Sequence, residues 1–289
     1  MDPFPVPVRS IGPGSQPVDD EELQYLAMPR EMATFRMPLV PDCVASEALT
    51  EARDALAALL RTMEGWNPDS AVPGPRFDLA GVGPEALVIV NQMLGEGEVS
   101  IKVDGGQPHV IQESVFTGLW RVVARGPGGA PAGDWIEVAK MPQVVGAAAR
   151  SAAAAAIPDV ALPPGAMNSP ALLAELAAQM RERRADGIAH VVNLTLFPMT
   201  PEDHAVLDRA LPVGPVAIMS RGFGNCRITS TGARDVWRVQ YFNNMNTLIL
   251  NTIEVVEMPE VALAAAEDLA DTRTRLAELV EWMSESCPA

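Results

Sequence analysis

Cysteine and histidine are scarce in this chain, and their scarcity limits the chemistry that it can perform. The 289 residues include three cysteines and three histidines, which are Cys43, Cys226, Cys287, His109, His190 and His204. The cysteines are far apart and odd in number, and no CxxC, HxxH or HExxH spacing occurs. Because zinc sites and disulfide frameworks depend on such patterns, we predict no metal and no cofactor.

Recognisable catalytic motifs are missing as well. No serine or cysteine lies in a nucleophile elbow with a base nearby. Catalytic triads are assembled in space from residues that are far apart in sequence, so this absence weighs against an enzyme without excluding one.

Basic residues are fewer than acidic residues in this chain. Lys and Arg total 21 against 37 Asp and Glu, which gives a formal net charge of −16 at pH 7. Phosphate backbones and anionic membrane surfaces repel such a chain, so we expect neither nucleic acid nor a lipid surface as a partner. The excess of acid either serves solubility alone or forms an acidic face that attracts a basic segment of a partner.

Long apolar runs are also lacking. The most apolar stretch, VVGAAARSAAAAAI, is interrupted by Arg150 and is shorter than the roughly 20 residues of a membrane-spanning helix. The first residues lack the basic and apolar segments of a signal peptide. We therefore expect a cytoplasmic protein with reduced thiols and no membrane insertion. A hydrophobic fraction of 48% is enough to build a core.

The sequence does contain a segment that occurs twice in similar form, as WIEVAKMPQVV and later as TIEVVEMPEVA. The same shift of 117 residues aligns Trp120 with Trp237 and, without a gap, the whole stretch from Asp78 to Val145 with a later one. Self-similarity at a fixed shift indicates a repeated supersecondary unit, and two copies indicate a tandem duplication.

Both copies predict the same elements in the same order. Helices are predicted from apolar residues at helical spacing and from capping residues (Ser46, Ser169 and Thr200) over residues 46–64, 84–94, 142–156, 169–183, 201–211 and 259–283. Strands are predicted from alternating apolar and polar residues over 99–103, 109–115, 119–124, 135–138, 216–220, 226–231, 236–242 and 252–255.

Short strands in a meander with helices before and after them predict an α+β fold. We predict two tandem repeats of a helix-plus-antiparallel-sheet module, related by pseudo-twofold symmetry, whose two sheets or helices meet around the axis. The predicted domains are an extended Pro/Gly-rich arm over 1–44, a first module over 45–160 and a second module over 161–289.

Two glycine-containing loops are candidate partner-binding sites. LGEGEVSI lacks the GxGxxG spacing and follows a helix, so it is either a helix end that enters a strand or an exposed acidic recognition loop. SRGFGNCRI is either a hairpin turn or a recognition loop. Its Cys226 is either a buried strand residue or, if exposed beside a basic residue, a reactive thiol. The candidate residues of the two loops are Glu96, Gly97, Glu98, Arg221, Gly222, Phe223, Gly224, Asn225 and Arg227.

Charged and aromatic residues are duplicated inside the predicted strands, namely Arg121 and Arg238, Glu137 and Glu254, and Trp120 and Trp237. One interpretation is a cross-strand Glu–Arg ion pair on each solvent face, worth about 0.2–1 kcal/mol. The other is a pocket between the modules in which all four charged residues meet, with a catalytic pair of carboxylates at the pseudo-axis, a role that needs burial to shift a pKa. The tryptophans are either core aromatics or one wall of a partner pocket.

Along almost its whole length, the chain resembles the HupH/HyaF family of hydrogenase expression/formation proteins. The stretches that carry the resemblance occur in the expected order: IGPGSQPVDD, LGEGEVSI, QESVFTGLWRV, MNSPALL, NLTLFPMT, RGFGNCRI and PEVALAAAEDLADTRTRLAEL. The resemblance implies an accessory role, as an assembly chaperone, in the maturation of an uptake [NiFe]-hydrogenase. It implies no catalytic residues. Glu113, in QESVFTGLWRV, joins the candidate partner-binding residues.

The resemblance therefore predicts a non-enzymatic protein that binds the immature iron–sulfur small subunit before its export. Its predicted partners are this small-subunit precursor and, as further candidates, other maturation accessory proteins. The alternative prediction is an enzyme or small-molecule-binding protein with a pocket at the interface of the two modules. The sequence leaves open whether the chain forms homo-oligomers.

Overall fold

The structure is a computed structural model that describes residues 46–68, 72–183, 188–222 and 224–286. The predicted arm over 1–44 lies outside the described residues. The described helices are α1 (Ser46–Thr62), α2 (Pro84–Leu94), α3 (Gln143–Ser151), α4 (Ser169–Glu182), α5 (Pro201–Ala210) and α6 (Ala266–Ser286), with short 3-10 helices η1 (Pro127–Gly129), η2 (Leu194–Leu196) and η3 (Glu260–Ala262). None of the described helices is long and apolar enough to cross a membrane.

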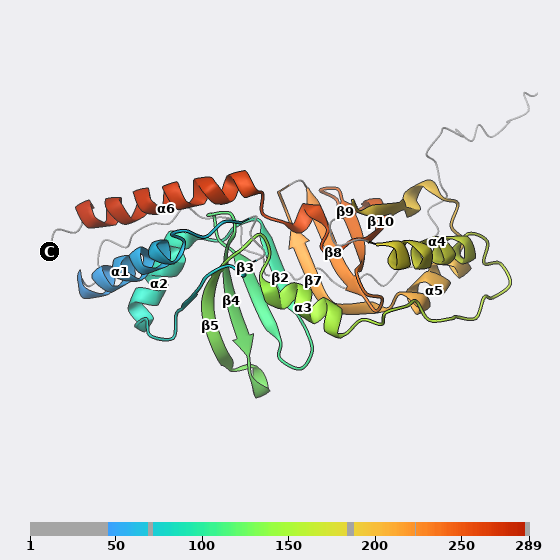
Figure 1. Ribbon diagram of the computed structural model, residues 1–289, viewed down its shortest axis with the longest axis horizontal. Coiled ribbons are helices and arrows are strands. Elements are labelled where there is room, and N and C mark those ends of the chain that lie inside the picture. Colours follow the sequence, from blue (N-terminus) through green and yellow to red (C-terminus); the bar gives the residue numbers. More distant parts are fainter. Residues whose placement is uncertain (1–45, 69–71, 184–187, 223, 287–289) are drawn as a thin grey trace, which may run out of the picture. The chain divides into compact units, whose positions relative to one another are not determined.

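A single antiparallel sheet runs through the described part of the chain (Figure 1). Its order is β1-β5-β4-β3-β2-β7-β8-β9-β10-β6. The strands are β1 (Arg76–Asp78), β2 (Val99–Val103), β3 (His109–Glu113), β4 (Leu119–Arg125), β5 (Pro131–Val138), β6 (His190–Asn193), β7 (Val213–Ser220), β8 (Asn225–Thr231), β9 (Val236–Phe242) and β10 (Leu248–Val255). The α+β class is confirmed.

The two expected sheets are one sheet, because β2 of the first half pairs antiparallel with β7 of the second. Ile101 lies opposite Ile218, and the 117-residue shift equates these two residues. The flanking pairs are related in the same way. The 117-residue shift converts the pair of Val99 and Ser220 into the pair of Val216 and Val103 on the other side of Ile101 and Ile218. Each half therefore covers the edge strand that the other would leave open.

The sheet has two faces, which we name after their duplicated residues. The tryptophan face carries Trp120 and Trp237, and its core of aliphatic strand residues is covered by Val145 and Ala149 of α3. The opposite side, the arginine face, carries Arg121 and Arg238. Its two ends are covered by helices, α1 and α2 at one end and α4 and α5 at the other (Figure 1).

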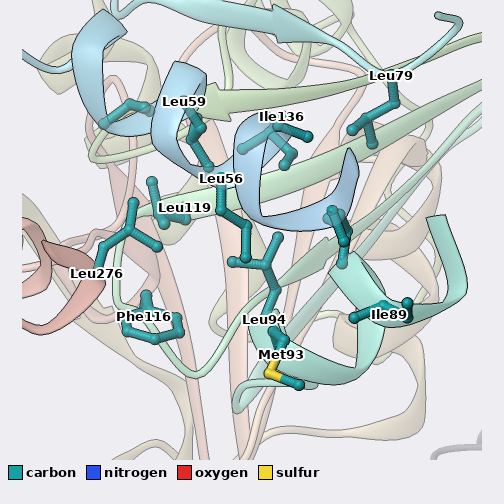
Figure 2. Close-up of a cluster of buried hydrophobic side chains, with 14 of the residues drawn as sticks. Leu56, Leu59, Leu79, Ile89, Met93, Leu94, Phe116, Leu119, Ile136 and Leu276 are labelled. Atoms are coloured by element: carbon teal, nitrogen blue, oxygen red, sulfur yellow. The ribbon is translucent and has the colours of Figure 1, made fainter. Parts of the chain in front are cut away.

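The helical cluster at the first end of the arginine face is the largest in the described part. Leu56 and Leu59 of α1 pack against Ile136 of β5, and Leu276 of α6 joins them (Figure 2). Burying one such side chain fully stabilises the fold by about 1.5–3 kcal/mol. The C-terminal helix α6 belongs to the second half in sequence, yet it packs on α1 of the first half.

Two predicted helices are shorter than expected. α3 ends at Ser151 rather than at residue 156, because the Ala154 backbone is bonded elsewhere. Its N–H donates to the Gly232 carbonyl (2.8 Å), and its carbonyl accepts from the Arg234 N–H (2.9 Å). The helix predicted over 259–283 is likewise interrupted between η3 and α6. Tertiary hydrogen bonds here override the helix propensity of alanine.

One predicted helix cap is confirmed and another is wrong. Thr200 caps α5, where its hydroxyl accepts from the Asp203 N–H (3.1 Å) in a capping box. Ser169 does not cap α4, because it lies inside the helix and donates its hydroxyl to Asp203 (2.8 Å). Burial alone would raise the pKa of Asp203, but hydrogen bonds from Ser169, Thr200 and Met167 hold it well below its usual range.

The edge strands β1 and β6 were not predicted, and they correct the gap-free alignment of the repeats. Arg76 of β1 lies opposite Glu137, whereas Val191 of β6 lies opposite Glu254. The offset between these two strands is therefore 115 rather than 117 residues. The connection from β6 to α5 is two residues longer than the connection from β1 to α2. The alignment of the two halves therefore needs a gap of two residues before the helix.

Candidate functional site

The two predicted loops lie side by side, because the β2–β7 pairing brings the start of β2 next to the end of β7. The Arg221 N–H donates to the Glu98 carbonyl (3.1 Å), and the Glu98 carboxylate lies against Gly222. Glu96, Glu98 and Arg221 are exposed. We call residues 95–98, 221, 222, 224 and 225 the two-loop surface; Phe223 lies outside the described residues.

The backbone of the first loop is fixed by β3. The Gly97 N–H donates to the Glu113 carbonyl (2.7 Å), and the Gln112 side-chain amide donates to the Gly97 carbonyl (3.2 Å). A Cβ at Gly97 would collide with the Ser114 carbonyl. Glycine is therefore required here by close backbone approach. The helix end is at Gly95, which caps α2 with a φ of 58°.

Glu113 lies beneath the two-loop surface and is only 7% exposed. Burial raises the pKa of Glu113 to about 7; a hydrogen bond from the Gly118 N–H (3.1 Å) opposes the rise, and the nearby charges of Glu98 and Asp268 reinforce it. This carboxyl therefore changes charge near neutral pH directly under the loop. Because it is buried, any effect on a partner passes through the loop above it.

Both duplicated tryptophans are core residues, so the interpretation of Trp120 and Trp237 as a partner wall is wrong. They are 0% and 2% exposed. The Trp120 indole N–H donates to the Ala139 carbonyl (2.8 Å), and that of Trp237 donates to the Glu257 carbonyl (3.2 Å). Each indole thus forms a hydrogen bond with the backbone just before one of the two Met-Pro sequences, Met141-Pro142 and Met258-Pro259.

The predicted Glu–Arg pairs do not form. Trp120 lies opposite Glu137 and Trp237 opposite Glu254, so both glutamates occupy the tryptophan face while Arg121 and Arg238 occupy the other. Because side chains alternate between faces, residues one position apart point away from each other. The four-residue pocket is therefore wrong for the same reason.

Arg121 and Arg238 instead form hydrogen bonds that connect the sheet to the helices α2 and α5. Arg121 donates to both carboxylate oxygens of Asp134 (3.0 and 2.6 Å) and to the Asn91 side chain of α2 (2.6 Å). Arg238 donates to Asp208 of α5 (2.9 Å). Asn91 and Asp208 are themselves 117 residues apart, so the two helices are held in corresponding ways.

The loop residues Cys226 and Arg227 point to opposite faces of β8. Cys226 is 1% exposed, and burial, opposed by a hydrogen bond with Tyr241, raises the pKa of its thiol to about 11. A buried protonated thiol is inert, so the reactive-thiol interpretation is wrong. Arg227 is half-buried on the arginine face, and desolvation lowers its pKa.

A cavity of about 740 Å³ lies where the two Met-Pro turns meet. Its lining includes Trp66, Met141, Pro142 and Arg150 from the first half and Met258 from the second. None of the four predicted pocket residues lines it. In the part of the chain that the structure describes, no group of three or more His, Cys, Asp or Glu residues is arranged to hold a metal.

Known proteins resemble the chain over nearly its full length. It is 44% identical to the hydrogenase expression/formation protein HoxQ of Cupriavidus necator, over 98% of this chain and 99% of that protein. It is 42% identical to the hydrogenase expression/formation protein HupH of Rhodobacter capsulatus, over 96% and 98%. With the hydrogenase-1 operon protein HyaF of Escherichia coli the identity is 32%, over 96% and 97%.

Among solved structures, the hydrogenase expression protein HupH from Thiobacillus denitrificans aligns with 41% of this chain and 96% of its own, at 28% identity and a TM-score of 0.37. The family model for the C-terminal conserved region of the HupH hydrogenase expression protein matches two successive segments, residues 49–159 and 166–283. The chain therefore belongs to the HupH family of hydrogenase expression proteins.

Proposed function

We propose that this protein is an assembly chaperone that binds the immature iron–sulfur small subunit of an uptake [NiFe]-hydrogenase in the cytoplasm, before export. Membership of the HupH family supports a role in hydrogenase maturation, since relatives across the family are named hydrogenase expression/formation proteins. The small subunit as client, a non-catalytic role and contacts with other accessory proteins are our proposals.

The observation that carries the proposal is the two-loop surface. Two loops from different halves join at the centre of the sheet and expose Glu96, Glu98 and Arg221. The first loop, whose backbone is held by hydrogen bonds to β3, carries exposed acidic side chains and suits a basic segment of a client, because acidic surfaces attract basic ones and a preorganised loop loses little entropy on binding.

We also infer that the chain arose by duplication and that its halves are related by pseudo-twofold symmetry. The symmetric register about Ile101 and Ile218 supports this inference, as does the matching attachment of α2 and α5 by Arg121 and Arg238. The arm over 1–44 and the modules over 45–160 and 161–289 stay predictions. In this account the two-loop surface exists only because the halves are joined.

The test is capture of a purified small-subunit precursor by the immobilised protein. Reversing both loop charges, Glu96→Lys with Glu98→Lys, should weaken capture at least about tenfold, because two attractive charges become repulsive. The matched control reverses two exposed charges on α6, Glu278→Lys with Glu281→Lys, and should capture as the unchanged protein does. Equal loss in both variants, or in neither, removes the two-loop surface from the proposal.

A second candidate function rests on the cavity between the Met-Pro turns. Its volume of about 740 Å³ is in the range of small-molecule sites, which run to about 300–1,000 Å³. Met141 and Met258 bring the two halves together in its lining. Screening small molecules by thermal shift, with Met258→Trp as the filled-cavity variant, tests this function. A ligand that stabilises both proteins equally does not bind there.

A further inference from the structure

The middle of the arginine face carries polar and cationic side chains between its helix-covered ends. One row of cross-strand neighbours runs through Arg121, Gln112, Ser100, Met219, Arg227 and Gln240. The next row includes the exposed side chains of Lys102 and Val110. Helix packing by the described residues is confined to the two ends of this face.

Three of the cations on this face have an anionic partner. Arg121 pairs with Asp134, Arg238 with Asp208, and Lys102 with Asp104 at 3.0 Å. Their charges are largely neutralised locally, although Lys102 remains exposed and its ion pair is of the weak surface kind.

Arg227 differs from these three cations. It lies between Met219 and Gln240 on the neighbouring strands, and none of the described residues forms a hydrogen bond or ion pair with its guanidinium. The group is half-buried, and its pKa is lowered by desolvation alone. Placing a cation in such a site costs free energy unless an anion approaches it.

We propose that the arginine face binds an acidic segment of another protein and that a carboxylate of this segment pairs with Arg227. Half-buried Met219 offers an apolar contact beside Arg227, and the exposed Val110 offers another opposite Lys102, so a segment that alternates acidic and apolar residues fits the face best. The net charge of −16 does not prevent this, because charges beyond about 8 Å are screened at physiological ionic strength. The inference does not depend on the client being a hydrogenase subunit.

The experiment measures binding of a fluorescent peptide of about eight alternating Glu and Val residues, a length that matches a typical strand. A peptide with Gln in place of Glu is the matched ligand control. We expect the acidic peptide to bind the full chain at about 0.15 M salt, where the distant acidic charges are screened, and to bind more weakly as the salt rises toward about 1 M. Arg227→Gln should weaken binding about tenfold or more, because a charge-assisted hydrogen bond is lost. Lys102→Gln should weaken it less.

The matched control for the protein is Arg273→Gln, which removes an exposed cation from α6, a helix that belongs to the cluster at one end of this face and not to its middle. It should bind the peptide as the unchanged protein does. Equal binding by Arg227→Gln, or equal binding of the Gln peptide, overturns the proposal. An unchanged thermal melting curve for Arg227→Gln shows that any loss of binding is not a loss of fold.

The chain's own acidic run, Asp19 to Glu22, is the alternative occupant, and it lies outside the described residues. Replacing its four acids by amides in the full chain should leave peptide binding unchanged. A gain of about tenfold would mean that this run competes for Arg227, and it would overturn the assignment to another protein. If the peptide fails to bind but the small-subunit precursor is still captured, this inference fails and the proposed function stands.

Discussion

Glu137 and Glu254 occupy matching places in the two halves, opposite Trp120 and Trp237, yet their surroundings differ. Glu137 is 0% exposed. It accepts hydrogen bonds from the Gln143 N–H (2.8 Å) and the Trp135 indole (3.3 Å), and it pairs with Arg76. Glu254 is partly exposed, and the hydrogen bond that it accepts from Thr252 is long (3.3 Å).

The difference comes from the edge strands. β1 sets Arg76 opposite Glu137, whereas β6 sets Val191 opposite Glu254. Without a cation, desolvation raises the pKa of Glu254, opposed by the Thr252 hydrogen bond. Residues at matching positions of the two halves therefore share a place in the sheet but differ in their interactions, because these depend on the edge strand that lies beside each residue.

The largest expected contrast is between removal of the two glutamates. Glu137→Ala should lower the free energy of unfolding by about 3–4 kcal/mol, because it leaves the Gln143 N–H and Arg76 without their acceptor. Glu254→Ala should change it by about 1 kcal/mol or less. Urea denaturation of both variants at neutral pH measures the contrast. Equal losses would show that the two sites are equivalent after all.

A second contrast compares Glu113 with Ser230, its counterpart at the 117-residue shift. The folded-state pKa of Glu113 is raised to about 7, so the folded protein holds this proton more tightly than the unfolded chain does. Stability from this group is therefore present below pH 4.5 and is lost as the pH rises through 7. The loss amounts to about 3 kcal/mol.

Denaturation across this pH range tests the sign. Glu113→Gln should remove the decline between pH 4.5 and 7, whereas Ser230→Ala should leave the slope unchanged while lowering stability at every pH. A slope that persists in Glu113→Gln would mean that another group causes it.

The smallest expected effects come from exchanging the edge partners. Val191→Arg places a cation opposite Glu254 and should raise the free energy of unfolding by about 0.5–1 kcal/mol at pH 7. It should also lower the pKa of Glu254. Arg76→Val removes the corresponding cation and should cost about 1–2 kcal/mol. NMR titration of the glutamate side chains, together with urea denaturation, reports both changes. An unchanged Glu254 pKa would contradict the comparison.

The sequence predicted much of the fold because its signals are local. The alternation of apolar and polar residues in strands, the Pro-Glu pairs at helix starts and the Thr200 cap are all recognised from neighbouring residues. The sequence repeat shows most of these patterns a second time. β1 and β6 escaped prediction because strands of three or four residues have no readable period. The merging of two expected sheets into one also has no local signal, since it depends on a pairing of distant strands.

The candidate site was only partly predictable. Both loops were identified, but their contact through Glu98 and Arg221 follows from the β2–β7 register rather than from either loop. The partners of Arg121, which are Asn91 and Asp134, depend on which face each residue occupies. The burial of Glu113 likewise arises from tertiary packing and left no pattern in the sequence.

The most direct test of the proposed function is co-purification from cells that are making a [NiFe]-hydrogenase, with a tag on this protein and identification of the bound chains. We predict recovery of the immature small subunit, and its loss when Glu96 and Glu98 are both changed to Lys. Recovery of no hydrogenase subunit, from cells in which the precursor is abundant, would contradict the proposed function.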